Sequence, residues 1–201
     1  MNIQSKKHVS FSTNTVLKGI LALLLASQIT ACIPVVVGGA AAGGAMAADR
    51  RTSGVYVEDQ NIELKANKKI ADALGEAAHV NITSFKGNVL LTGEVPNDAA
   101  KANAESLAKA IESVRNVTNE LTVGPKSSIS SRANDAYLTS KVKAQFVSEN
   151  RFQANYVKVV SENSAVYLLG SVSQQEADAA VEIARNTSGV AKVVKVFEYT
   201  N

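Results

Sequence analysis

An internal repeat constrains the fold of this chain more than any other feature of its sequence. Residues 89–95 (VLLTGEV) return as residues 166–172 (VYLLGSV), 77 positions later. The same succession of patterns surrounds both copies: a helical pattern, an alternating strand and a tight turn before, and an alanine-rich helical pattern and a second strand after. This repetition predicts two similar small domains in tandem.

The helical patterns predict which faces are buried. Apolar side chains recur at helical spacing before and after each repeated strand. Before it they are Ala66, Ile70 and Leu74 in the first copy, and Leu138, Val142 and Phe146 in the second. After it they are Ala100, Ala104, Leu107 and Ile111 in the first copy, and Ala177, Val181 and Ala184 in the second.

The strand patterns predict the topology. Alternation marks strands around Val80–Ser84 and Val157–Ser161, followed by turns at Gly87-Asn88 and Asn163-Ser164. The last strands are expected at residues 114–121 and 190–197. Each unit is therefore αββαβ, with an antiparallel hairpin and a parallel crossover strand. The predicted fold class is α+β, with two small mixed three-stranded sheets, each backed by two helices.

The N-terminal segment is typical of a bacterial lipoprotein signal. Residues 1–31 contain basic but no acidic residues, and an apolar core precedes Ile29-Thr30-Ala31-Cys32. A transmembrane anchor is disfavoured, because the apolar run is well short of roughly 20 residues. A buried structural thiol is the other alternative for Cys32, the only cysteine. The apolar-small-small-cysteine pattern resembles a lipobox, which implies cleavage before Cys32 and its acylation with fatty acids such as palmitate.

Loss of this signal changes the charge balance. Residues 1–31 hold three lysines and no acid, so the mature chain has 18 basic and 18 acidic residues. The apparent basicity therefore gives no support to nucleic-acid binding, which needs a basic surface on the folded part.

Composition also predicts the domain boundaries. A glycine- and alanine-rich stretch after Cys32 is too poor in large side chains to form a core and is expected to be a tether. Gly124-Pro125-Lys126-Ser127-Ser128 breaks the repeat and predicts a linker. The expected segments are a signal peptide 1–31, a lipidated tether 32–58, a first domain 59–123, a linker 124–133 and a second domain 134–201.

The paired units, each with a V-x-L-x-G-like strand between two helices, resemble BON domains. With the lipobox, the tether, Asp49-Arg50-Arg51-Thr52-x-Gly54 and Asp59, the whole chain is similar to the DolP family of dual-BON outer-membrane lipoproteins. This resemblance implies attachment to the periplasmic face of the outer membrane of a Gram-negative bacterium, and Ile33 after the cysteine agrees with outer-membrane sorting. It also implies anionic phospholipid binding through the second BON domain, a role in outer-membrane integrity and accumulation at the division site.

No catalytic constellation is found in the sequence. His79 is the only histidine after the signal, and it is expected to begin a strand, since a metal site needs several convergent ligands. The prominent carboxylates are scattered over helix faces and suggest no acid–base pair. We therefore expect a protein that is not an enzyme and has no cofactor or metal beyond the lipid on Cys32.

The predicted binding surface lies on the first helix of the second domain. Aligned at a shift of 72 residues, the outward face of the first-domain helix is polar, with Lys65, Lys68, Asp72 and Gly75. The second helix instead presents Tyr137, Ser140, Ala144 and Val147, flanked by Lys141 and Lys143 and followed by Arg151. An exposed tyrosine beside lysines suits the headgroup region of an anionic membrane, and the resemblance implies an aromatic at this position. Packing against the first domain, or an ordinary exposed face, would explain the same pattern.

The expected function is that of a lipid-anchored periplasmic protein that binds anionic phospholipid and supports outer-membrane integrity. The alternative is an adaptor for outer-membrane assembly, division or peptidoglycan-remodelling proteins.

Overall fold

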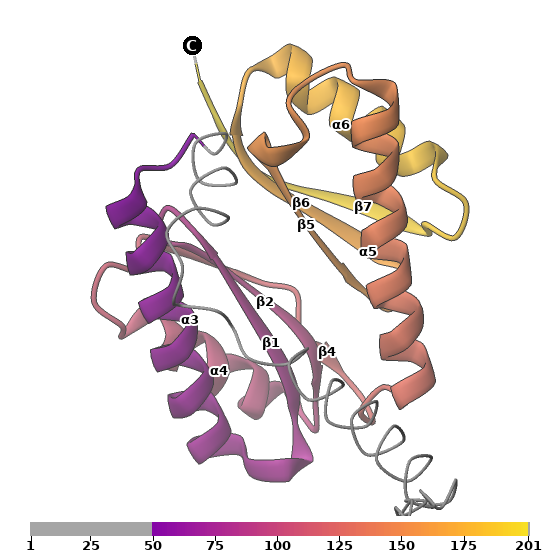
Figure 1. Ribbon diagram of the computed structural model, residues 1–201. Helices are drawn as coiled ribbons and strands as arrows, with labels where there is room; N and C mark the ends of the chain where they lie inside the picture. The colour runs from indigo at the N-terminus through magenta and orange to yellow at the C-terminus, as the bar shows by residue number, and fades with distance from the viewer. Residues whose placement is uncertain (1–49, 201) are drawn as a thin grey trace, which may run out of the picture. The chain divides into compact units, whose positions relative to one another are not determined.

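The computed structural model describes residues 50–200. The predicted signal peptide, Cys32 and the greater part of the predicted tether lie outside the described residues. Two successive αββαβ units follow, as the repeat predicts (Figure 1). The first contains α3 Ser53–Leu74, η2 Gly75–Ala77, β1 His79–Phe85, β2 Asn88–Val95, α4 Asp98–Lys109, β3 Asn116–Asn119 and β4 Thr122–Val123. The second contains α5 Ile129–Glu149, η3 Ala154–Tyr156, β5 Val157–Glu162, β6 Ala165–Val172, α6 Gln174–Asn186 and β7 Lys192–Tyr199.

Both sheets have the predicted mixed topology. The repeated strand is central in each: β2 pairs antiparallel with β1 and parallel with β3 and β4, and β6 pairs antiparallel with β5 and parallel with β7. The closing strand of the first sheet is interrupted, because Leu121 turns inward between β3 and β4 and is fully buried. Strand β7 runs two residues beyond the predicted end.

The first hairpin turn lies one residue earlier than predicted. Phe85 pairs with Asn88, so Lys86 and Gly87 form the turn, both with positive φ. A two-residue turn with two positive φ values matches the twist of the hairpin, and Gly87 meets this demand without strain. In the second unit Asn163 and Ser164 form the turn with positive φ, as predicted.

The first helix of each unit begins before the boundary drawn from the sequence. Helix α3 starts within the predicted tether, because the Thr52 hydroxyl accepts a hydrogen bond from the Val55 amide. Helix α5 starts within the predicted linker, because the Ser128 hydroxyl caps it in the same way through Ser131. These N-caps satisfy amides that otherwise lack helical partners.

The helices of each unit cover one face of its sheet (Figure 1). One core lies between α3, α4 and the first sheet, and a second lies between α5, α6 and the second sheet. A third apolar cluster joins the other faces of the two sheets through Phe85 and Leu90 of the first domain and Tyr167 and Leu169 of the second. The sheets, rather than the helices, therefore provide the apolar contact between the domains.

Candidate lipid-binding surface

The four residues Tyr137, Ser140, Ala144 and Val147 form what we call the outward face of α5. Tyr137 is 65% exposed and Val147 is 67% exposed. On the opposite side of the helix, Leu138, Val142 and Phe146 are buried in the core of the second domain, as the sequence predicts. Packing of this core side leaves the outward face toward solvent.

Packing of the outward face against the first domain, one of the two alternatives, is wrong. Tyr137 and Val147 are more than half exposed, and the apolar interdomain contact is made by the two sheets. Sequence reasoning did not reveal that contact, although the unbroken apolar run Val89-Leu90-Leu91 is a signal for a strand buried on both faces.

Ile129 extends this apolar surface and was missed by the sequence analysis. It is the first residue of α5 and is 80% exposed. At 100° per residue it lies on the same side of the helix as Val147, about 27 Å away along the axis. It was missed because it falls in the segment assigned to the linker.

The basic residues near the outward face differ in their environments. Lys143 is exposed and forms no ion pair among residues 50–200. Lys141 is half-buried and donates a hydrogen bond to the Ser188 carbonyl at 2.9 Å. Arg151 pairs with Glu182 at 2.9 Å and with Glu149 at 3.9 Å. Lys143 is therefore the residue best placed to offer uncompensated charge to a phosphate.

The corresponding face of α3 is less polar than the sequence alignment suggested. The buried positions of the two helices match at a shift of 76 rather than 72: Ile62 corresponds to Leu138, and Ile70 to Phe146. The counterparts of the outward face are then Asn61, Leu64, Lys68 and Ala71. Leu64 is 69% exposed, while Lys68 pairs with Asp72 at 2.8 Å. With the strands 77 residues apart, the segment from Ile70 to Val80 is one residue shorter than the segment from Phe146 to Val157, whereas a helix shift of 72 implied a difference of five.

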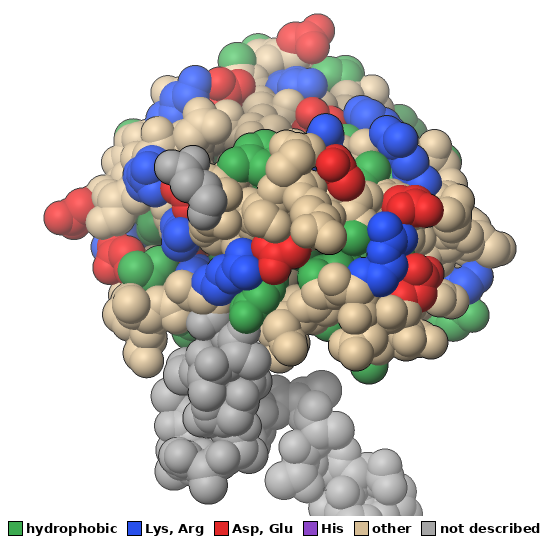
Figure 2. Space-filling view, turned by 90° about the horizontal axis from the view of Figure 1, so that it is seen from above, with side chains coloured by type: hydrophobic (Ala, Val, Ile, Leu, Met, Phe, Trp, Pro, Cys, Tyr) green, Lys and Arg blue, Asp and Glu red, His purple; other side chains and the backbone are tan. Residues whose placement is uncertain are grey.

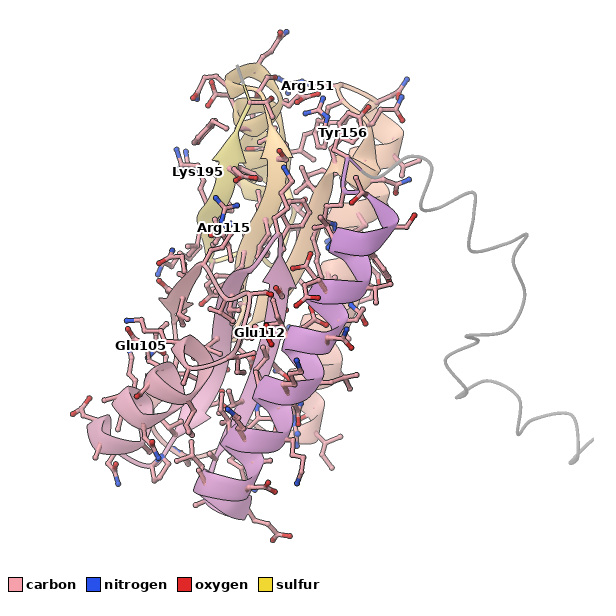
Figure 3. The ribbon with its side chains drawn as sticks, turned by 90° about the vertical axis from the view of Figure 1, so that its left-hand side faces the viewer. Glu105, Glu112, Arg115, Arg151, Tyr156 and Lys195 are labelled. Carbon is pink, nitrogen blue, oxygen red and sulfur yellow. The ribbon has the colours of Figure 1, made fainter. Side chains whose placement is uncertain are left out.

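Arg50, the first described residue, is held by the second domain. Its guanidinium donates two hydrogen bonds to the Glu176 carboxylate at 2.8 and 2.7 Å and one to the Ser171 carbonyl at 2.8 Å. It also lies over the Tyr156 ring, 3.8 Å from the centroid. Figure 3 shows Tyr156 at the same end of the second domain as Arg151. The hydrogen bond to Glu176 raises the pKa of Arg50 despite partial desolvation. The end of the tether is thus fixed to the domain that carries α5.

Charges elsewhere are interspersed. Figure 2 shows lysine and arginine side chains alternating with aspartate and glutamate over the visible face. The face that Figure 2 shows therefore has no basic surface of the kind nucleic acids require. No helix within residues 50–200 is long and apolar enough to cross a membrane.

His79 begins β1, as predicted, but it is not isolated. Glu94 and Glu162 lie beside it, both buried. Neither carboxylate was singled out from the sequence, because strand pairing and the contact between the domains bring them together.

Comparison with known proteins finds the same two domains that the internal repeat predicts. The BON domain model matches residues 58–125 and 134–201. The outer membrane lipoprotein DolP of Haemophilus influenzae is 44% identical over 183 residues, which cover 89% of this chain and 95% of that protein. The 21 kDa hemolysin of Actinobacillus pleuropneumoniae is 37% identical, covering 75% and 79%. The osmotically-inducible protein Y of Escherichia coli is 28% identical, covering 70% and 72%.

Proposed function

Because this chain belongs to the dual BON-domain DolP family of outer-membrane lipoproteins, we propose that it binds anionic phospholipid through α5 and supports outer-membrane integrity at the periplasmic face. The role is binding rather than catalytic. Lipidated Cys32 provides the anchor, and α5 provides the contact with headgroups. Accumulation at the division site follows if the anionic lipid it binds is enriched there.

The observation that carries this proposal is that α5 exposes both a tyrosine, Tyr137, and a lysine, Lys143, that has no ion pair within residues 50–200. Tyr137 presents an amphipathic ring that suits the headgroup region, and Val147 and Ile129 add apolar area along the same helix. Lys143 supplies positive charge, and a lysine near an anionic surface contributes about 1 kcal/mol. The helix therefore combines apolar and electrostatic attraction on one surface.

The anchor makes a weak contact sufficient. A single acyl chain holds a protein only marginally, whereas two or more hold it firmly. The segment from Cys32 to Arg50 reaches at most roughly 60 Å when fully extended. The second domain is thereby confined near the bilayer, and high effective concentration populates a headgroup contact of low intrinsic affinity.

Vesicle cosedimentation tests this proposal. The chain from residue 50 onward contains all the described cores and lacks the anchor, so any binding reports the domains alone. We expect binding to vesicles with anionic phospholipid and none to purely neutral vesicles. Tyr137→Glu should weaken the binding at least tenfold, because it removes the ring and adds repulsion.

Leu64→Glu is the matched control, since Leu64 is similarly exposed on the equivalent helix of the first domain. It should leave binding unchanged. Equal losses in both variants would assign the effect to general surface charge. Absence of binding to either type of vesicle would make the adaptor role for assembly, division or peptidoglycan-remodelling proteins the leading interpretation.

A further inference from the structure

A histidine and two carboxylates converge where the two domains meet. His79 lies at the start of β1, Glu94 on β2 and Glu162 at the end of β5. One ligand atom from each lies within 4.8 Å of the others. The first two residues belong to the first domain and Glu162 to the second, so the group forms only when the domains are in contact.

Glu94 fixes the orientation of the imidazole. Its Oε2 lies 3.1 Å from His79 Nδ1 and accepts a hydrogen bond from the Ser127 amide, while its Oε1 accepts one from Asn163 Nδ2 at 2.7 Å. Burial opposes ionisation of Glu94, but these hydrogen bonds outweigh it and lower its pKa. An ionised carboxylate only accepts, so Nδ1 carries the proton. In the neutral ring, Nε2 therefore carries the lone pair, and the Asn81 amide nitrogen lies 3.5 Å away from it.

Glu162 has an unsatisfied oxygen. Its Oε2 accepts a hydrogen bond from Asn81 Nδ2 at 2.8 Å, whereas its Oε1 is buried without a partner among the described residues. The whole residue is 5% exposed. Burial, and then the negative charges of Glu94 and Asp135, raise its pKa despite the hydrogen bond from Asn81. A buried, unpaired carboxylate oxygen is unfavourable unless a proton or a cation satisfies it.

His79 and Glu162 line a cleft that opens to solvent. Asn81, Arg132 and Asp135 line it with them, and its volume is about 320 Å³. The Asn81 amide nitrogen lies 2.8 Å from Glu162 Oε2 and 3.5 Å from His79 Nε2, and so bridges the two side chains. Asn81 is exposed, so its amide can turn outward and leave this position to an ion.

From this arrangement we infer that His79 Nε2 and Glu162 bind a divalent transition-metal ion of the Zn²⁺ class between the two domains, with water completing the coordination. Imidazole and carboxylate are ordinary Zn²⁺ ligands at 2.0–2.2 Å, so tetrahedral ligand atoms lie about 3.4 Å apart. The Asn81 amide nitrogen now lies between the two ligands, 3.5 Å from His79 Nε2 and 2.8 Å from Glu162 Oε2, so both side chains must move inward to coordinate an ion directly. Glu94 acts as the orienting carboxylate behind the histidine, an arrangement common at such sites. Mg²⁺ and Ca²⁺ prefer more oxygen ligands.

Titration of the metal-free, full-length protein in non-ionic detergent tests the inference. Zn²⁺ binding is measured by competition with a chromophoric chelator, and thermal unfolding is followed with and without ZnCl₂. We expect one site that is lost or weakened at least tenfold in His79→Gln and Glu162→Gln. Glu94→Gln should weaken it about tenfold to 100-fold through the orienting hydrogen bond. Because the site exists only in the folded protein, a hundredfold excess of Zn²⁺ over Kd should raise the Tm by about 5 °C or more.

Two further variants keep the test decisive. Glu112→Gln removes an exposed carboxylate outside the cluster and should leave Zn²⁺ affinity unchanged. Asn81→Asp places a third carboxylate beside both ligands at an exposed position and should tighten binding at least tenfold, even if the buried variants fail to fold. Absence of Zn²⁺ binding, or affinity unaffected by His79→Gln and Asn81→Asp, would overturn the inference and leave a hydrogen-bonded interdomain contact. Both results are independent of vesicle binding by α5.

Discussion

Asp59 and Asp135 occupy equivalent positions in the two domains, and each holds the hairpin turn of its own sheet. Asp59 accepts hydrogen bonds from the Lys86 and Gly87 amides, both at 2.9 Å. Asp135 accepts them from the equivalent amides of Asn163 and Ser164 at 3.0 and 2.9 Å. Both aspartates are buried. The first helix of each domain is thereby locked to the turn between its first two strands.

Removal of either aspartate should destabilise the protein, to different extents. Asp59→Ala is expected to lower the free energy of unfolding by about 3–5 kcal/mol, because it also leaves the buried Arg51 without this carboxylate, 2.9 Å away. Asp135→Ala should lower it by about 1–3 kcal/mol, because it leaves only amides unpaired. Urea denaturation of both variants measures the two losses. Equal losses would show that the ion pair with Arg51 contributes nothing.

The contribution of Asp59 should depend on pH. Burial opposes its ionisation, but hydrogen bonds from Ser84, Gly87, Lys86 and Arg51 outweigh burial and lower its pKa. Because the folded pKa lies below the unfolded value of about 3.9, this stabilisation is present above pH 4 and is lost as pH falls through the folded pKa. The difference in unfolding free energy between the native protein and Asp59→Asn should therefore shrink as the pH falls below about 4. A constant difference would contradict the assignment.

Substituting alanine for two different glycines should change the stability of the protein in opposite directions. A Cβ on Gly93 would lie 2.0 Å from the His79 carbonyl oxygen, and its φ is +114°. Gly93→Ala should therefore lower stability by about 2–4 kcal/mol, by backbone strain and displacement of β1. A Cβ on Gly54, in the first turn of α3, meets nothing within 4 Å, and Gly54→Ala should raise stability by up to about 1 kcal/mol. Thermal unfolding of both variants checks the two signs.

The topology was predictable from the sequence, whereas the register of the repeated helix was not. Shifts of 72 and 76 differ by about one helical turn, so both place Val142 on a buried face and periodicity cannot separate them. Asp59 and Asp135 establish how α3 aligns with α5, but they are polar and were therefore not part of the apolar pattern used for the alignment. Their burial and their contacts with the turn amides, which the structure shows, identify Asp59 and Asp135 as equivalent.

The candidate surface was partly predictable for a related reason. Tyr137 and Val147 follow from the position of the buried face, so their exposure agrees with the pattern. The hydrogen bond of Lys141 and the ion pair of Arg151 with Glu182 depend on residues from α6 and the segment after it. These partners are distant in the sequence and could not be predicted from the residues around α5. The sequence analysis therefore predicted more available positive charge beside α5 than the structure has.

Contact between the sheets should couple the unfolding of the two domains. Leu90 and Leu91 are neighbours and both fully buried, but Leu90 faces the second domain and Leu91 the core of the first. Each Leu→Ala change should lower stability by about 2–4 kcal/mol. Leu90→Ala should also divide the calorimetric transition into two, because it weakens the contact between the domains. Leu91→Ala should leave a single transition, because that contact is intact. A single transition in Leu90→Ala would show that polar contacts suffice for coupling.

The electrostatic and apolar contributions to lipid binding by α5 should depend differently on salt concentration. Attraction between Lys143 and anionic headgroups is screened as ionic strength rises, whereas burial of the Tyr137 ring is not. Lys143→Ala should therefore weaken binding at low salt and flatten its dependence on NaCl concentration. Tyr137→Ala should weaken binding by a similar factor at every salt concentration.

Lys141→Ala serves as the comparison within the helix. Its amine already donates to the Ser188 carbonyl, so its loss should reduce the salt slope less than the loss of Lys143. Vesicle cosedimentation from 50 to 500 mM NaCl measures all three slopes. If Tyr137→Ala and Lys143→Ala gave the same slope, the ring and the charge would not act as separate contributions. If Lys141→Ala gave the larger change, its hydrogen bond to Ser188 would have to open at the membrane.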